Sequence, residues 1–298
     1  MIEQPLKGVI PPMMTPFKEN GDVDFDGHVF NMEKWNEDQL CGYLVLGSNS
    51  ETTYLNEAEK LKLIELTVKH ARKDRLVLAG TGMESARETI ALTNKAADLG
   101  VRAALVLTPS YYFAKMNDEA QIAFFSEVAD HTRIPVLIYN VTPFTHINIS
   151  AQAVSVLSRH PNVIGMKDST GNVPQLVNFQ RVMDDSFNLI LGTVSAWYPA
   201  LTLGVKAGIF AMANCAPNEC ALVQQAFDDG DHDKARETYR RIFPANAAVT
   251  ATFGIAGLKY ASDLMGYRGG FVRNPLVPLK VAEKAKIEEI FKTAELIS

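Results

Sequence analysis

A lysine at the end of an apolar run is the residue of this sequence best suited to covalent chemistry. In "NVIGMKDSTG" (162–171), apolar and small residues lead to Lys167, and the next four residues have the composition of a turn. A buried ammonium group needs a partner or loses its proton. Lys167 is therefore either a strand-end side chain that extends into solvent or an amine held neutral for reaction. A neutral amine can attack a ketone and form a Schiff base, which withdraws electrons from the adjacent carbon.

A tyrosine ends the preceding apolar run, "IPVLIYN" (134–140). If the two runs form neighbouring strands, Tyr139 and Lys167 can face each other. Schiff-base formation needs an acid and a base because the carbinolamine must lose water, and a phenol can serve as both. The pair is what amine catalysis needs, and the solvent-extending lysine stays open as the alternative.

Residues for other common chemistries are missing from the pattern. No His, Cys, Asp and Glu set converges as a metal site requires, and "GTGMES" (80–85) matches only half of a dinucleotide fingerprint. We therefore expect no metal and no organic cofactor. The histidines are interpreted as solvated or capping residues, and only His146 is near a strand-end loop; they are His28, His70, His131, His146, His160 and His232.

Composition excludes several classes of protein. The chain has 298 residues, a net charge of -5 and 47% hydrophobic residues, which is typical of soluble globular proteins. No basic stripe indicates a nucleic-acid partner, and no apolar run of about 18 residues indicates a membrane helix. The N-terminus lacks the pattern of a signal peptide. Cys41, Cys215 and Cys220 form no obvious disulfide framework, which favours a reducing, cytoplasmic location.

The elements that position these residues follow a regular order. Eight short apolar runs alternate with amphipathic segments, and runs that are apolar on both faces are typical of parallel strands covered on both sides. The pattern predicts a (β/α)8 TIM barrel over 1–230 and a C-terminal helical extension over 231–298 packed on it. The predicted strands are 8–13, 42–47, 75–80, 102–108, 134–140, 162–167, 187–192 and 207–213; the predicted helices between them are 25–39, 56–72, 85–100, 117–131, 150–159, 173–184, 195–204 and 218–230.

Chemistry in such a barrel takes place at the carboxyl ends of the strands. In this sequence those ends hold small polar groups, tyrosines and one lysine, which again leaves Lys167 as the candidate nucleophile. The strand-end stretches are "GSNSE" (47–51), "GTG" (80–82), "TPSYY" (108–112), Tyr139-Asn140, Lys167-Asp168, Gly192-Thr193 and Asn214.

Five motifs occur in the same order as in the pyruvate-dependent class I aldolases, and the sequence resembles this family, which includes dihydrodipicolinate synthase and N-acetylneuraminate lyase. The resemblance covers nearly the whole chain and is carried by "GVIPPMMTPF", "GSNSE", "TPSYY", "YN" at 139–140 and "GMKDS" at 165–169. It implies a lyase active as a homotetramer, a dimer of dimers, with pyruvate and an aldehyde as small-molecule partners.

The resemblance also implies roles for individual residues. Lys167 is similar to the Schiff-base lysine and Tyr139 to the proton shuttle above it. Ser48 matches the middle of a proton relay, and Tyr111 matches the relay tyrosine that a neighbouring subunit supplies, with Tyr112 as the alternative. The positions that match substrate-binding ones are Gly47, Ser48 and Asn49 for the pyruvate carboxylate, Gly192 for substrate space, and Ile209 for contact with the lysine adduct.

One departure from the pattern bears on the reaction. The synthases usually carry an arginine a few residues after the strand-five tyrosine, but this chain has Phe144 there. Together with Ser-Asn in the substrate loop, this favours the 4-hydroxy-2-oxoglutarate aldolase branch and its sugar-acid relatives. The expected reaction is cleavage of a 4-hydroxy-2-oxo acid to pyruvate and an aldehyde such as glyoxylate.

Two alternatives stay open: a dihydrodipicolinate synthase that condenses pyruvate with aspartate semialdehyde, and a non-catalytic barrel that binds pyruvate-like ligands. The choice of aldehyde is expected to depend on the loops at 142–147, 193–196 and 214–218.

Overall fold

Two compact units make up the chain in the computed structural model, which describes residues 6–298. The first unit contains Val77–Gly208, and the second contains Gly8–Leu76 together with Ile209–Ser298. The predicted segment 1–230 begins in residues 1–5, outside the described part. Its division from 231–298 stays a prediction.

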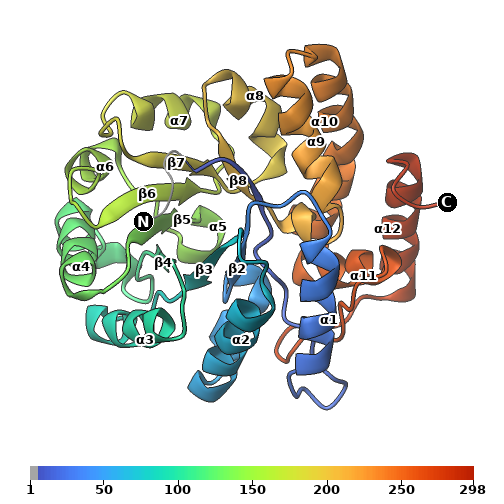
Figure 1. The fold of residues 1–298 in the computed structure, drawn as a ribbon, viewed down its shortest axis with the longest axis horizontal. Helices are drawn as coiled ribbons and strands as arrows, with labels where there is room; N and C mark the ends of the chain where they lie inside the picture. Colours follow the sequence, from blue (N-terminus) through green and yellow to red (C-terminus); the bar gives the residue numbers. More distant parts are fainter. Residues whose placement is uncertain (1–5) are drawn as a thin grey trace. The chain divides into compact units, whose positions relative to one another are not determined.

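Parallel strands form the centre of the first unit. From β3 to β8 each strand pairs with the next one in the chain, and helices α3, α4, α6 and α7 lie outside them (Figure 1). Val136, Leu137 and Ile138 of β5 have no exposed surface. This double-sided burial explains why the strand sequences are apolar throughout rather than alternating.

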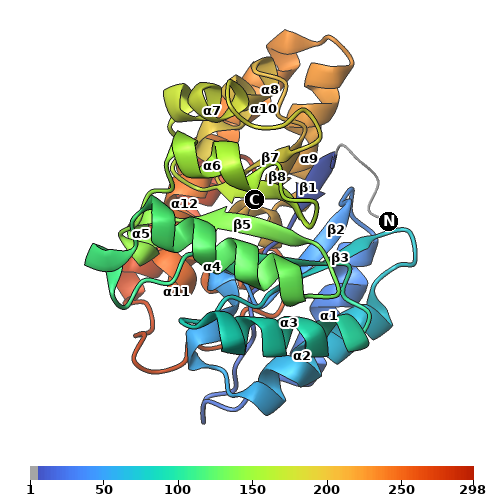
Figure 2. The same cartoon turned by 90° about the vertical axis from the view of Figure 1, so that its left-hand side faces the viewer.

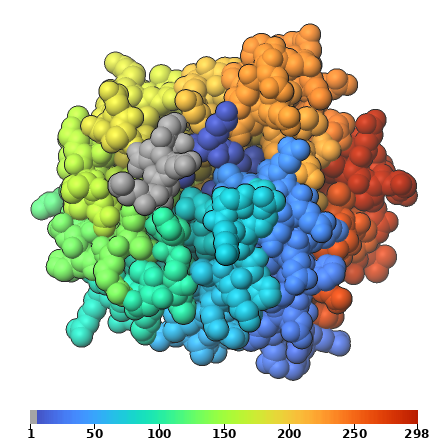
Figure 3. Space-filling view, in the orientation of Figure 1, coloured from blue at the N-terminus to red at the C-terminus, as the bar shows by residue number. Residues whose placement is uncertain are grey.

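The second unit combines the first two strands with the C-terminal helices. The N–H of Met13 donates to the carbonyl of Leu44 at 2.9 Å, and Asn214 holds the same segment, because its side chain accepts from Met14 N–H and donates to the carbonyl of Pro12. Helices α1 and α2 pack side by side and form adjoining blue surfaces in Figure 3. Figure 2 shows α1 and α2 from the side.

The eight strands occur where the sequence predicts them, although several are shorter. β8 was expected over 207–213 but ends at Ile209, because the N–H of Ala213 donates to the carbonyl of Phe210 and begins a 3-10 turn. The strands are β1 Gly8–Ile10, β2 Gly42–Val45, β3 Leu76–Gly80, β4 Ala103–Leu107, β5 Val136–Asn140, β6 Val163–Asp168, β7 Asn188–Leu191 and β8 Ala207–Ile209.

The helices also follow the prediction, with one addition. Asn56 and Glu59 form the expected capping box, and Ser85 accepts from the N–H of Glu88, which is one half of the other. The short α5 was not predicted. The helices are α1 Phe25–Asn36, α2 Glu57–His70, α3 Ala86–Asp98, α4 Asp118–His131, α5 Thr142–Thr145, α6 Ala151–Leu157, α7 Val173–Gln180, α8 Trp197–Thr202, α9 Pro217–Asp228, α10 His232–Ala247, α11 Gly254–Leu264 and α12 Val281–Thr293.

Eight strand–helix repeats in chain order give the protein the (β/α)8 barrel fold, with helices at its C-terminal end. Cys41, Cys215 and Cys220 are free; Cys215 and Cys220 are buried, while Cys41 is half-buried. Within residues 6–298, no helix has both the length and the apolarity needed to span a bilayer.

Candidate active site

Lys167 and Tyr139 lie against each other at the ends of two neighbouring strands. They are partners in the parallel register of β5 and β6, and Lys167 Nζ lies 4.3 Å from the centroid of the Tyr139 ring. Only 4% of Lys167 and 7% of Tyr139 is exposed. The pairing expected from the sequence is therefore confirmed, and the amine is withdrawn from bulk water beside a phenol.

A hydrogen-bond network fixes the strand ends around this pair. Asn140 Nδ2 donates to Asp168 Oδ1 at 2.7 Å, and Gln175 Nε2 donates to the same oxygen at 3.1 Å. The other oxygen of Asp168 accepts from the Thr170 hydroxyl at 2.5 Å. Asp168 was expected in the turn but is the last residue of β6, because its fully buried carboxylate is held by these donors. Its side chain points away from that of Lys167 because strand residues alternate in direction.

Gly192 is placed where no side chain fits. A Cβ there would lie 1.9 Å from Ser169 Oγ, and the N–H of Gly192 donates to the carbonyl of Asp168 at 2.6 Å. The substrate-space role implied for Gly192 stays a prediction, but the close approach explains why this position needs a glycine.

Two buried hydroxyls near the strand ends lack a hydrogen-bond partner among the described residues: Ser169 Oγ and Thr108 Oγ1. Buried polar atoms are rarely left unpaired, so these two hydroxyls are exceptions among the buried groups near the strand ends. Neither hydroxyl was predicted from the sequence as part of the site. The spacing of Ser169 could have indicated it, because residues two apart in an extended chain point to the same side and Ser169 follows Lys167 by two. The chain is still paired at this point, since the N–H of Ser169 donates to the carbonyl of Asn140.

The tyrosines of the loop after β4 face solvent. Tyr111 is 77% and Tyr112 70% exposed, and their rings pack edge to face with centroids 4.9 Å apart. Glu84 holds this loop because its carboxylate accepts the N–H groups of Ser110 and Tyr111, each at 2.9 Å. The choice between Tyr111 and Tyr112 as a relay residue stays open.

The second unit holds the remaining predicted residues. Ser48 and Asn49 begin a 3-10 turn that follows Gly47. The carboxylate-binding role implied for Gly47, Ser48 and Asn49 stays a prediction. Ile209, the last residue of β8, is fully buried.

Buried charges hold the end of this turn. Glu51 has a left-handed backbone with φ of 54°, and its carboxylate lies 2.5 Å from Lys259 Nζ and accepts the N–H of Arg273 at 2.8 Å. Burial lowers the pKa of Lys259 to about 8 despite the neighbouring Glu51. The Arg273 guanidinium pairs with Glu59 and lowers the pKa of that carboxyl. No local sequence pattern indicates this set, because Lys259 follows Glu51 by 208 positions.

Nothing in residues 6–298 brings three His, Cys, Asp or Glu side chains together as a metal site would.

Comparisons with known proteins point to one family. Residues 5–294 match the model of the dihydrodipicolinate synthetase family. A 4-hydroxy-tetrahydrodipicolinate synthase of Thermodesulfovibrio yellowstonii is 33% identical over 98% of this chain and 99% of its own length, and one of Archaeoglobus fulgidus is 32% identical over the same shares. The crystal structure of a dihydrodipicolinate synthase from Bacillus anthracis matches with a TM-score of 0.92 at 27% identity, covering 98% of this chain and 99% of that one.

Proposed function

Because the chain belongs to the dihydrodipicolinate synthetase family, and is thus a carbon–carbon lyase of the pyruvate-dependent class I aldolase type, we propose that Lys167 forms its Schiff base with pyruvate. The single observation that carries this proposal is the burial of the Lys167 amine against the Tyr139 ring, 4.3 Å from its centroid.

In the proposed chemistry, the Lys167 amine attacks the 2-oxo carbon of pyruvate, and the Tyr139 hydroxyl protonates the departing oxygen, which leaves as water. The resulting iminium draws electrons from C3, whose proton passes to the deprotonated Tyr139 oxygen, and an enamine is formed. Ser48 and Tyr111 would pass protons between Tyr139 and solvent. Gly47, Ser48 and Asn49 would hold the pyruvate carboxylate, Gly192 would leave space for substrate, and Ile209 would contact the adduct.

For the second substrate, the names of the relatives favour aspartate semialdehyde. Several relatives that align over nearly their whole length are called 4-hydroxy-tetrahydrodipicolinate synthase. In this reaction the enamine carbon attacks the aldehyde, a new carbon–carbon bond forms, and the aldehyde oxygen takes up a proton. Synthase activity is therefore our first candidate.

A second candidate, cleavage of a 4-hydroxy-2-oxo acid such as 4-hydroxy-2-oxoglutarate or a 2-keto-3-deoxy sugar acid, is favoured by one residue of the first unit. Phe144 stands on α5 with 60% of its surface exposed, where the synthases usually carry an arginine. In this direction Tyr139 removes the proton of the 4-hydroxyl and the C3–C4 bond breaks, which releases the aldehyde and leaves the enamine of pyruvate.

A substrate panel separates these reactions. The protein would be assayed with pyruvate plus aspartate semialdehyde, with 4-hydroxy-2-oxoglutarate, and with 2-keto-3-deoxy sugar acids. Turnover of the first pair alone supports the synthase, and turnover of the oxo acids alone supports the aldolase. A protein that binds pyruvate but turns over none of them, and gives no adduct on borohydride reduction, would be the non-catalytic barrel.

We further propose a cytoplasmic homotetramer built as a dimer of dimers. The solvent-facing rings of Tyr111 and Tyr112 support this, because a relay tyrosine supplied to a neighbouring subunit must project from its own chain. Sedimentation velocity of the wild type measures the mass, and the doubly substituted Tyr111→Ala/Tyr112→Ala should dissociate. A wild-type monomer that is fully active would overturn the proposal.

A further inference from the structure

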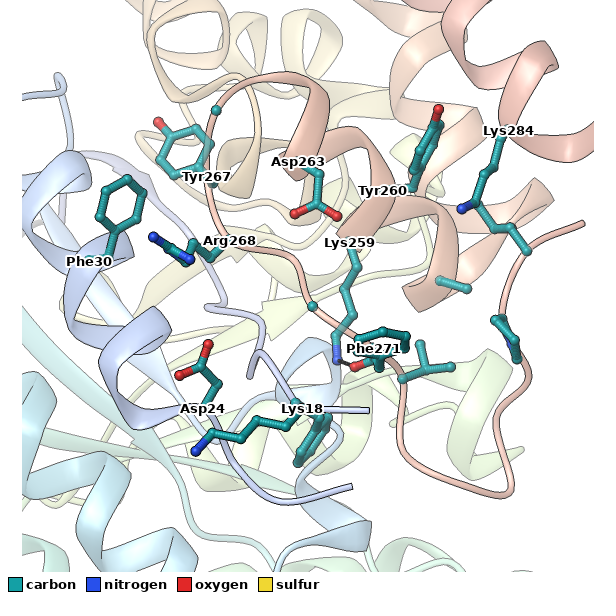
Figure 4. Close-up of a pocket in the computed structure, with 17 residues that line it drawn as sticks. Lys18, Asp24, Phe30, Lys259, Tyr260, Asp263, Tyr267, Arg268, Phe271 and Lys284 are labelled. Atoms are coloured by element: carbon teal, nitrogen blue, oxygen red, sulfur yellow. Dashed lines mark hydrogen bonds between the residues drawn. The ribbon is translucent and has the colours of Figure 1, made fainter. Parts of the chain in front are cut away.

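A cavity of about 650 Å³ opens on the second unit, between α1, α11, α12 and the segment 266–279 (Figure 4). Its size is in the range of pockets that hold small organic ligands. All of its lining residues belong to the second unit, whereas Lys167 and Tyr139 belong to the first. We call it the aromatic pocket, after the rings of Phe17, Phe30, Tyr260, Tyr267 and Phe271 that line it.

Its walls suit a flat apolar body. Phe30 and Phe271 remain 40% and 50% exposed, so their ring surface is available to a ligand. Tyr267 is held rigidly, because its ring stacks on Trp35 at 5.6 Å and its hydroxyl donates to Asp38 at 2.8 Å. Aromatic walls of this kind favour stacking with an aromatic ring.

An arginine lies at the edge of this pocket, and its guanidinium contacts an aromatic ring rather than a carboxylate. The Arg268 guanidinium lies 4.9 Å from the centroid of the Phe30 ring. Asn31 fixes its backbone in both directions, accepting the Arg268 N–H at 2.7 Å and donating to its carbonyl at 2.8 Å. No described residue hydrogen-bonds or forms an ion pair with the guanidinium itself. Its N–H groups are therefore available to bind a carboxylate through two parallel hydrogen bonds.

The charged residues that line the pocket favour a ligand with a single negative charge. Lys18, Arg268 and Lys284 are exposed cations of the lining, and Asp24 and Asp263 are its carboxylates, so the rim has one positive charge in excess. Lys259 adds none, since it is paired with Glu51 outside the lining. A polyphosphate would meet the two carboxylates, whereas a single carboxylate would not exceed the available charge.

We propose that the aromatic pocket binds a small aromatic monocarboxylate, with its ring beside Phe30 and Phe271 and its carboxylate on Arg268. A ligand there reaches the substrate turn through Lys259 in the pocket wall. Lys259 Nζ donates to the carbonyl of Phe271 at 2.5 Å and lies 2.5 Å from the carboxylate of Glu51, which ends the turn of Ser48 and Asn49. Displacement of Phe271 by the ligand therefore changes the affinity for pyruvate, and by linkage pyruvate changes the affinity for the ligand. This second step rests on the proposed function, and binding in the pocket does not.

The test of binding uses 2-naphthoate and its uncharged amide, 2-naphthamide, titrated into the full chain by calorimetry without pyruvate. The proposal expects the wild type to bind 2-naphthoate at one site per chain. The Kd should be at least about tenfold higher for 2-naphthamide with the wild type, and likewise for 2-naphthoate with Arg268→Gln. Lys62→Gln is the matched control, because it removes a positive charge from an exposed α2 residue outside the lining. No binding at millimolar concentration, or equal weakening in both variants, overturns the proposal.

The link to the turn is tested by borohydride trapping of pyruvate with and without saturating 2-naphthoate. The pyruvate concentration for half-maximal labelling should shift at least twofold in the wild type and in Lys62→Gln, and should not shift in Arg268→Gln. Binding without such a shift retains the pocket and refutes the link. Absence of any pyruvate adduct refutes the proposed function, while the calorimetric titration still decides whether the pocket binds.

Discussion

Replacing Lys259 with methionine should destabilise the protein by about 3–5 kcal/mol, which is the usual effect of removing one partner of a buried ion pair. The Lys259 and Glu51 side chains are 2% and 0% exposed and lie 2.5 Å apart. Methionine fills much of the lysine volume but leaves the Glu51 carboxylate without its cation. The loss is then due to an uncompensated charge rather than to a cavity.

The strained turn adds to this effect. Glu51 has a left-handed φ of 54°, a conformation that a non-glycine residue holds at a cost of about 1–3 kcal/mol. With Lys259 replaced, Glu51 is held mainly by the N–H of Arg273. The Gly47–Glu51 segment should loosen, and the KM for pyruvate should rise more than kcat falls.

Urea unfolding followed by circular dichroism measures the loss. The double variant Glu51→Gln/Lys259→Met should recover a substantial part of it, because the uncompensated carboxylate is gone. Lys62→Met, which breaks an exposed pair with Glu65, should change the free energy of unfolding by less than about 1 kcal/mol. A Lys259→Met variant as stable as the wild type, or a double variant that loses the sum of both single losses, would refute the reasoning.

Three further substitutions test other parts of the structure. Tyr139→Phe should lower kcat about 10²–10⁴-fold while pyruvate trapping becomes slow rather than absent, since it removes a proton-transfer group but keeps the ring beside the amine; unchanged kcat in a steady-state assay would exclude the role. Gly192→Ala should destabilise by about 1–3 kcal/mol in urea, because its Cβ would lie 1.9 Å from Ser169 Oγ and 2.9 Å from the backbone atoms Asp168 O and Ser169 Cα; equal stability would contradict this account of the glycine. Burial lowers the pKa of His28 to about 4 from 6.5. Between these two pH values His28 is protonated in the unfolded chain and neutral in the folded chain. The free energy of unfolding therefore falls as pH falls, by up to about 1.4 kcal/mol per pH unit. His28→Gln should flatten this slope in unfolding curves taken from pH 7 to 4, and an unchanged slope would contradict the assignment.

Local sequence patterns were sufficient to predict the order of the elements. β5 and β6 are apolar along their whole length because both faces are buried, and this makes the two runs visible in the sequence. The same reasoning predicted that Tyr139 and Lys167 would be neighbours, since parallel strands that follow one another in a barrel end at the same edge. It failed for the end of β8, because "AGIFAMA" continues to look apolar through the 3-10 turn that begins at Ala211.

Long-range partners were beyond this reasoning. Lys259 follows Glu51 by 208 positions, and neither the amphipathic pattern of α11 nor the turn composition of "GSNSE" indicates that the two charges meet. Asp168 was assigned to a turn from its type, because its donors Asn140 and Gln175 come from elements before and after it. Such contacts depend on how the backbone is folded, and only the structure supplies that.

The central claim is that Lys167 is the Schiff-base residue, and borohydride trapping tests it most directly. Wild-type protein incubated with pyruvate and reduced should gain the mass of one 1-carboxyethyl group per chain, which is the reduced pyruvate adduct, and peptide mapping should place the added mass on Lys167. Lys167→Arg should show no added mass while keeping the circular dichroism spectrum of the wild type. An adduct on another lysine, or an equal gain in the variant, would contradict the account.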